Sequence, residues 1–201
     1  MTVRIGEIAS VRSGLNRSGR APGARPGPQT IRVVSGGDIR DDRIVLSGLE
    51  TAALTVDSFI EPHLLRPGDV LVTGKSTSVK AALVPADIGP AVANSTMLVI
   101  RPREPSFGTL IWWFLTSRRG RREAESRMLA GAALSSLPPY AVADIEMPLP
   151  GAAEMAGLVE LIEASEQAYR GAQEAASIRR EIVRDHIIDG LVRAGEPRRV
   201  K

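Results

Sequence analysis

Apolar residues in the first three quarters of the chain fall in short runs that Gly, Pro and charged residues interrupt. Such runs are typical of β-strands. The clearest is 70–73, the apolar part of the strand-like block Arg66-Pro67-Gly68-Asp69-Val70-Leu71-Val72-Thr73. Residues 3–11 predict a short helix or turn that ends at Gly14. The other predicted strands are 31–34, 44–46, 59–60, 81–84, 97–100 and the alternating stretch 142–147.

Two later segments change to the helical period. In 109–128, apolar residues at 110, 111, 114 and 115 form one stripe, so the first part of this segment is predicted as helix. Beyond the Met147-Pro148-Leu149-Pro150 break, apolar residues recur every three or four positions from 152 to about 191. These patterns predict an α+β fold with a β-rich domain over 1–150, a long helical arm over 151–194 and a basic tail over 195–201.

The apolar stripe of the arm must be shielded from water by another structural element. A helix of about 40 residues is roughly 60 Å long, which exceeds what one small domain covers. We expect a second helix, from another chain, to pack on it; the alternative is a helix that folds back or breaks at Gly171. The expected interface residues are Leu158, Leu161, Ile162, Tyr169, Ala172, Ala176, Ile182, Val183 and Ile187.

The net charge of +3 is unevenly distributed. Residues 1–150 carry 18 Lys and Arg against 14 Asp and Glu, whereas residues 151–195 carry 5 against 8. Residues 1–40 alone hold 7 basic and 2 acidic side chains, including Arg17, Arg20 and Arg25 on a loop rich in Gly and Pro. This excess favours a polyanionic partner such as nucleic acid; an arginine-rich surface that faces only solvent is the alternative.

Composition and motifs give no support for catalysis. The chain has no cysteine, which excludes disulfides and thiolate metal sites, and only two histidines, so we expect no metal and no cofactor. Gly74-Lys75-Ser76 resembles the end of a phosphate-binding loop, but Gly68 stands one residue too far away for that motif. Asp41 and Asp42 are interpreted as turn residues. No run is long enough for a membrane span and no signal peptide opens the chain, so we expect a cytoplasmic protein.

Several stretches, in this order, resemble the target recognition domain of type I restriction-modification specificity subunits. The resemblance runs over nearly the whole chain. It is carried by 4–9 with Gly14, Gly37-Asp38-Ile39, 67–73, 79–84, 93–102, 110–117 and 145–150. Complete specificity subunits have two such domains and two helices, whereas this chain has one of each, so it looks like a half-subunit.

The resemblance implies a DNA-recognition subunit without activity of its own. Two copies would pair through antiparallel helices as a homodimer and read a two-part site on double-stranded DNA. The partner would be a DNA methyltransferase subunit, with a restriction or translocase subunit as a further candidate. The expected DNA-binding residues are Arg17, Arg20, Arg25, Lys75, Ser76, Thr77, Ser78, Lys80, Arg118 and Arg119.

Three alternatives stay open. Arg118, Arg119, Arg121 and Arg122 are candidates for a DNA-backbone clamp, but they also suit a solvated helix end that the helix dipole favours. The chain as a whole would also suit an adaptor or scaffold of another phage-defence system, with no sequence preference. A small enzyme with a degenerate phosphate loop is the third, and it would bind nucleotides.

Overall fold

The computed structural model describes residues 1–16, 29–57, 59–131 and 134–195. The chain divides into two compact units, 1–156 and 157–201. Arg17, Arg20 and Arg25 lie outside the described residues, and so does the tail from residue 196 onward. Among the described helices, none is both long and apolar enough to cross a membrane.

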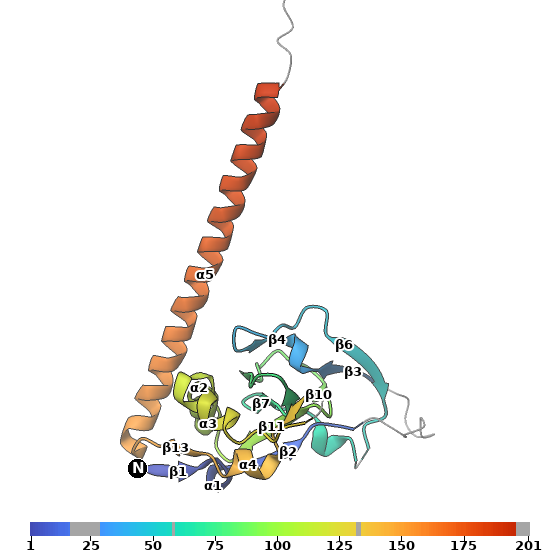
Figure 1. Ribbon diagram of the computed structural model, residues 1–201, viewed down its shortest axis with the longest axis vertical. Coiled ribbons are helices and arrows are strands. Elements are labelled where there is room, and N and C mark those ends of the chain that lie inside the picture. Colours follow the sequence, from blue (N-terminus) through green and yellow to red (C-terminus); the bar gives the residue numbers. More distant parts are fainter. Residues whose placement is uncertain (17–28, 58, 132–133, 196–201) are drawn as a thin grey trace, which may run out of the picture. The chain divides into compact units, whose positions relative to one another are not determined.

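A six-stranded sheet forms the centre of the first unit (Figure 1). All neighbouring strands are antiparallel except β5 and β9, which run parallel. The predicted strand 70–73 is confirmed, and its four residues are all buried. In spatial order the strands are β2 (Ala9–Ser13), β11 (Met97–Pro102), β7 (Val70–Thr73), β9 (Ala81–Leu83), β5 (Arg43–Ile44) and β4 (Ile39–Arg40).

A second, three-stranded sheet packs with its own core. Strand β3 (Gln29–Val34) lies between β10 (Ala91–Ala93), which is parallel to it, and β6 (Glu50–Leu54), which is antiparallel. Its core is a separate apolar cluster of Leu15, Ile31, Val33, Ile60 and Val92. Two ladders complete the unit: β1 (Thr2–Arg4) with β13 (Glu146–Pro148), and β8 (Lys75–Ser76) with β12 (Ser135–Ser136).

Helix α2 (Pro105–Thr116) covers the central sheet. It packs on β7, β9 and β11 and buries Leu110, Ile111 and Leu115, the stripe that the sequence predicts. Gly108 permits this approach, because a Cβ at that position would lie 2.4 Å from the carbonyl oxygen of Gly68. The shorter helical elements are α1 (Ile5–Ile8), α3 (Arg118–Glu125), α4 (Pro139–Ala143) and the 3₁₀ turns η1 (Gly36–Asp38) and η2 (Glu61–His63).

Some predicted elements are wrong. The stretch 142–147 is not one strand: α4 ends at Ala143 and β13 begins at Glu146, since Pro139 at the first helical position favours a helix start. The expected strand at 59–60 is a turn that leads into η2, which contains Pro62. The helix within 3–11 has only four residues, and strands flank it on both sides. Strands β6 and β10 escape sequence reasoning because partners on β3 stabilise them.

The turn that precedes β7 holds a buried ion pair. Residues 66–69 form a type II turn, with Pro67, Gly68 at φ +85° and a hydrogen bond of 3.0 Å from the Asp69 N–H to the Arg66 carbonyl. The Asp69 side chain is 1% exposed. It accepts hydrogen bonds from Arg101 Nε (3.0 Å) and Nη2 (2.7 Å) and from the Arg66 N–H (2.9 Å). The pair thereby joins the start of β7 to the end of β11.

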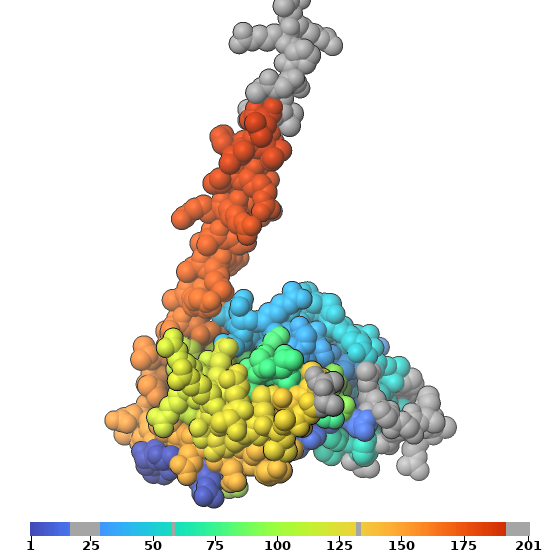
Figure 2. Space-filling model, in the orientation of Figure 1, coloured from blue at the N-terminus to red at the C-terminus, as the bar shows by residue number. Residues whose placement is uncertain are grey.

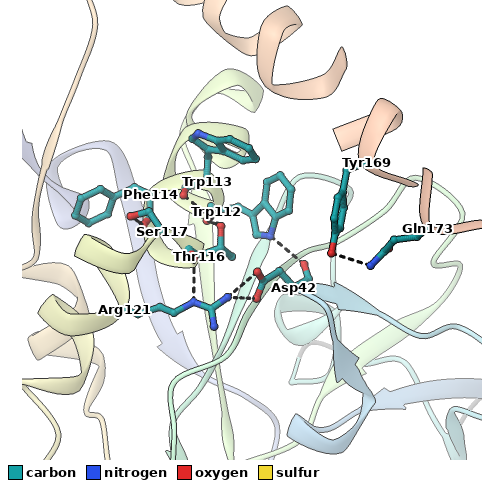
Figure 3. Close-up of polar contacts among 9 residues, drawn as sticks. All are labelled: Asp42, Trp112, Trp113, Phe114, Thr116, Ser117, Arg121, Tyr169 and Gln173. Atoms are coloured by element: carbon teal, nitrogen blue, oxygen red, sulfur yellow. Dashed lines mark hydrogen bonds and ion pairs between the residues drawn. The ribbon is translucent and has the colours of Figure 1, made fainter. Parts of the chain in front are cut away.

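A second polar cluster fastens the β4–β5 hairpin (Figure 3). Asp41 and Asp42 have φ of 47° and 60°, which fits the two-residue type I′ turn and confirms that they are turn residues. Arg121 Nη2 donates to both carboxylate oxygens of Asp42, at 2.7 and 2.6 Å. Trp112 Nε1 donates to the Asp42 carbonyl at 3.0 Å. Asp42 therefore links the hairpin to α2 and α3.

The predicted long helix is confirmed as α5 (Ala152–Gly195), which is 44 residues long. It passes through Gly171 without a break, so the alternative of a break at that residue is wrong. At its start, Glu154 accepts a hydrogen bond from the Gly151 N–H at 3.4 Å, an arrangement that caps the first turn. All side chains from 167 to 191 are exposed, and Figure 2 shows them projecting along the helix.

Two basic side chains near the ion pair have lowered pKa values. Burial is the main cause of the lowered pKa of Arg12, and the nearby charges of Arg101 and Arg66 add to it, against the opposing effect of Asp69. Burial also lowers the pKa of His63 below its usual value of 6.5, and the charge of Arg12 lowers it further. Within the described residues, Arg12 Nη2 is buried without a hydrogen-bond partner. Asp69 therefore binds Arg101 directly and also attracts the nearby charge of Arg12.

Removal of the buried carboxylate will test its contribution. Asp69→Ala leaves the Arg101 guanidinium without its charge partner, so we expect the free energy of unfolding to fall by about 3–5 kcal/mol. Urea denaturation measures this change. Asp87→Ala removes an exposed carboxylate of the same unit and serves as the control, with an expected change below about 0.5 kcal/mol. Equal effects of the two substitutions would contradict a stabilising role for the pair.

Protonation of His63 will also change the stability. Because its pKa is lower in the folded state than in the unfolded state, the unfolded state binds more protons near pH 6. We therefore expect the free energy of unfolding to decrease as the pH falls from 7.5 through 6.5, and His63→Asn to weaken that dependence. Urea denaturation across this pH range measures both. His186→Asn, at an exposed position on α5, is the control, and an unchanged dependence in His63→Asn would contradict the prediction.

Candidate nucleic-acid interface

Several polar segments leave the central sheet at one edge. Met97 pairs with Thr73, and Leu98 pairs with Ser13. Because β11 is antiparallel to both β2 and β7, its first residue lies beside the last residues of these two strands. The segments 74–80 and 94–96 and the chain that follows β2 therefore start or end together. Distant parts of the sequence meet here.

Backbone hydrogen bonds hold the 74–80 segment in place. The N–H groups of Gly74 and Lys75 both donate to the Thr96 carbonyl, at 2.8 and 3.0 Å. The Leu137 N–H donates to the Gly74 carbonyl at 2.8 Å, next to the β8–β12 ladder. Asn94 orders the neighbouring turn, since its Oδ1 accepts from the Thr96 N–H (3.1 Å) and hydroxyl (2.7 Å). The surface is thus built on fixed backbone.

Thr73 organises the side chains of this segment. Its hydroxyl donates to the Ser78 carbonyl at 3.0 Å and accepts from the Ser76 hydroxyl (3.1 Å) and the Lys80 N–H (3.0 Å). The Ser76 hydroxyl also contacts the Ser78 carbonyl. Of the expected DNA-binding hydroxyls, that of Ser76 is therefore engaged within the loop, while Thr77 and Ser78 have exposed side chains.

The two lysines of the segment differ. Lys75 is exposed, and within the described residues its ammonium makes neither a hydrogen bond nor an ion pair. Lys80 directs its ammonium to the carbonyl oxygens of Gly36 (3.3 Å) and Ile39 (3.2 Å), which ties the loop to η1 and β4. Lys80 therefore has a structural contact that sequence reasoning missed, whereas Lys75 is available to a ligand.

The arginines around Gly120 take different positions. Arg118 and Arg119 are exposed and begin α3, whose first turn is capped by the Ser117 hydroxyl that accepts from the Gly120 N–H at 3.1 Å. Arg121 suits the helix-end interpretation, because its Nε donates to the carbonyl of Thr116 in the last turn of α2 (2.9 Å). Arg118 and Arg119 instead lie in the first turn of α3, at the positive end of its helix dipole, which does not stabilise cations. Their exposed charges are therefore available for an anionic partner.

Sequence reasoning missed Ser135 and Ser136. Their register places Ser135 opposite Ser76 and Ser136 opposite Lys75. No local signal marks them, since β12 has two residues and follows a stretch of sequence rich in Gly and Ala. The segment 94–96 lies within a stretch that carries the family resemblance, but no binding role was assigned to it.

The described surface offers hydrogen-bonding groups and positive charge. Hydroxyl and amide side chains both donate and accept hydrogen bonds, and Lys75 supplies a mobile cation. In the described part of the chain, no group of three or more His, Cys, Asp and Glu side chains is placed to hold a metal ion. Phosphate oxygens and base edges are ligands that this mixture of groups can bind.

Neither the family models nor the curated protein sequences include a match to this chain. Solved structures do match. One is a chain from a study of complex assembly and conformational transition of the type I R-M system, with TM-score 0.59 and 16% identity over 92% of this chain and 43% of that one. Another is the HsdS subunit from Thermoanaerobacter tengcongensis, with TM-score 0.55 and 16% identity over 87% and 39% of the two chains.

A third match is the S subunit of a type I restriction-modification system from M. genitalium. Its TM-score is 0.57 at 12% identity, over 98% of this chain and 46% of that one. The chain therefore spans less than half the length of each of the three proteins. Over that span, α5 included, it has the fold of a type I restriction-modification specificity subunit.

Proposed function

We propose that this protein recognises a DNA sequence and directs a partner DNA methyltransferase to it, as a half-subunit of the type I specificity kind. The observation that carries the proposal is the match of 87–98% of the chain to specificity subunits. Recognition, rather than catalysis, is then the task of the chain. A restriction or translocase subunit is a further partner, and the cytoplasm is the expected compartment.

The polar edge of the sheet supports binding to DNA. Lys75 is an exposed cation at this edge, and Thr77 and Ser78 follow it with short, exposed polar side chains. Arg118 and Arg119 are exposed cations at the start of α3. Cations give affinity through phosphate contacts, whereas short side chains reach base edges. Arg17, Arg20 and Arg25 follow β2 directly in the sequence and are proposed as additional phosphate contacts.

The exposed stripe of α5 supports a homodimer. Leu161, Ile182 and Ile187 are 64%, 62% and 55% exposed, and Leu158, Tyr169 and Val183 are exposed as well. A soluble chain rarely leaves so many large apolar side chains in water on one element. The small side chains of Ala172 and Ala176 would allow a second helix to approach α5 closely. Ile162, also an expected interface residue, is already buried. A second copy of α5, packed antiparallel, would cover this stripe.

Antiparallel pairing has a geometric consequence. A two-fold axis through the helix pair relates two recognition units, so each reads the same half-site in opposite orientation. A helix of 44 residues is roughly 66 Å long. The helices would then set the distance between the half-sites.

Loss of the Lys75 charge will test DNA contact. We expect Lys75→Met to weaken binding to all duplexes by a similar factor and to reduce the slope of log K against log salt by about 1. Fluorescence anisotropy across a salt series measures both. Arg103→Met, an exposed cation at the far end of β11, is the control and should leave the slope unchanged. An unchanged slope for Lys75→Met would remove Lys75 from the interface. Wild-type protein without any sequence preference would favour the adaptor.

Charges on the stripe will test the dimer. Leu161→Asp with Ile182→Asp places carboxylates in the proposed apolar seam, so we expect monomers in sedimentation-velocity experiments, where the wild type is a dimer. Gln167→Asp with Ser177→Asp introduces the same charges at exposed positions of α5 that are not among the expected interface residues, and it should leave the dimer intact. A dimer that persists in the first variant would refute this seam.

A further inference from the structure

Strand β12 lies between two other segments at the polar edge. On one side it pairs with β8, through Ser135–Ser76 and Ser136–Lys75. On the other side the Ser136 N–H donates to the Leu129 carbonyl (2.9 Å) and the Leu129 N–H donates to the Ser136 carbonyl (2.8 Å). We call these three segments, Leu129, β12 and β8, the β12 ribbon. Backbone bonds on both sides hold β12 in one register, so its side chains start from fixed positions.

The side chains of β12 remain available to a ligand. Among the described residues, the hydroxyls of Ser135 and Ser136 have no hydrogen-bond partner, in contrast to that of Ser76. Both serines are half-buried. Two large apolar side chains accompany them, since Leu129 is 54% and Leu134 is 48% exposed. Apolar groups in water beside unused hydroxyls indicate a surface that a partner covers.

The β12 ribbon matches the chemistry of base edges better than that of phosphates. Leu129, Leu134, Ser135 and Ser136 carry no charge, so they add little to phosphate affinity. A two-stranded β-ribbon fits the major groove of B-DNA, where each base pair presents a distinct set of donors and acceptors. A serine hydroxyl can donate to or accept from these groups, and an apolar side chain can contact the thymine methyl group.

We propose that Leu134, Ser135 and Ser136 read base edges in the major groove, while Lys75 on the neighbouring strand contacts the phosphate backbone. This inference rests on the proposed function and names the residues that choose the sequence. The Ser76 hydroxyl, by contrast, serves to order the 74–80 segment through Thr73 and Ser78. Affinity and sequence choice thus belong to different strands of one ribbon.

The test uses the full-length chain. The preferred duplex is first selected from a random library with the wild type. Fluorescence anisotropy then compares this duplex with single-base variants for wild type, Ser135→Ala with Ser136→Ala, and the control Ser10→Ala at the far end of β2. For the double variant we expect discrimination at one or two adjacent positions of the half-site to fall by about tenfold. Binding to random duplexes should stay within about twofold, because no charge is lost.

Leu134→Ala provides a second readout. Replacement of each thymine of the selected site by deoxyuridine removes only the C5 methyl group. If Leu134 contacts one of these methyl groups, the wild type will lose affinity at that position, and Leu134→Ala will bind both duplexes equally. Thermal unfolding of every variant shows whether the fold is retained.

The outcomes separate this inference from the proposed function. Unchanged discrimination in the folded double variant, together with unchanged deoxyuridine sensitivity in Leu134→Ala, would overturn the role of β12 and leave DNA recognition intact. Loss of binding to every duplex would also overturn it, since that result assigns β12 to the fold or to the phosphate backbone. A wild type without sequence preference would overturn both proposals.

Discussion

The ion pair between Asp69 and Arg101 is the contact on which the first unit depends. It lies where β7 begins and β11 ends, and its carboxylate is almost fully withdrawn from water. A buried carboxylate without its partner would be costly, so the pair permits few arrangements of the two central strands. Within the type II turn at 66–69, the Arg66 N–H donates a further hydrogen bond to the Asp69 carboxylate. Gly108 then allows α2 to rest directly on this turn.

The position of the ion pair also explains the position of the candidate site. Because β7 and β11 are fixed at one end by Asp69 and Arg101, Thr73 and Met97 meet at the other end in a defined register. Hydrogen bonds that involve Thr73, Thr96 and Gly74 hold the loops at this end in fixed positions. A rigid base of this kind holds the hydrogen-bonding side chains at this end in defined positions.

The second unit obeys a different constraint. An isolated helix gains little from its own hydrogen bonds in water, and most helical stability in proteins comes from packing of an apolar face. Within α5, the described side chains from 167 to 191 are all exposed, although Ile182, Val183 and Ile187 are apolar. The helix therefore has apolar surface to offer to another chain. Packing of this face against other apolar surface would stabilise the helix.

The sequence by itself determined the elements whose signals are local. The apolar run 70–73 and the long period of α5 both depend on neighbouring residues, and the structure confirms both. Tertiary structure decided the strands that are stabilised by partners, such as β6, β10 and β12. It also decided which polar side chains are free, because Lys80 and Ser76 find partners on segments that no sequence period reveals. Local propensity acts over a few residues, whereas a binding surface is assembled from segments that only the completed sheet brings together.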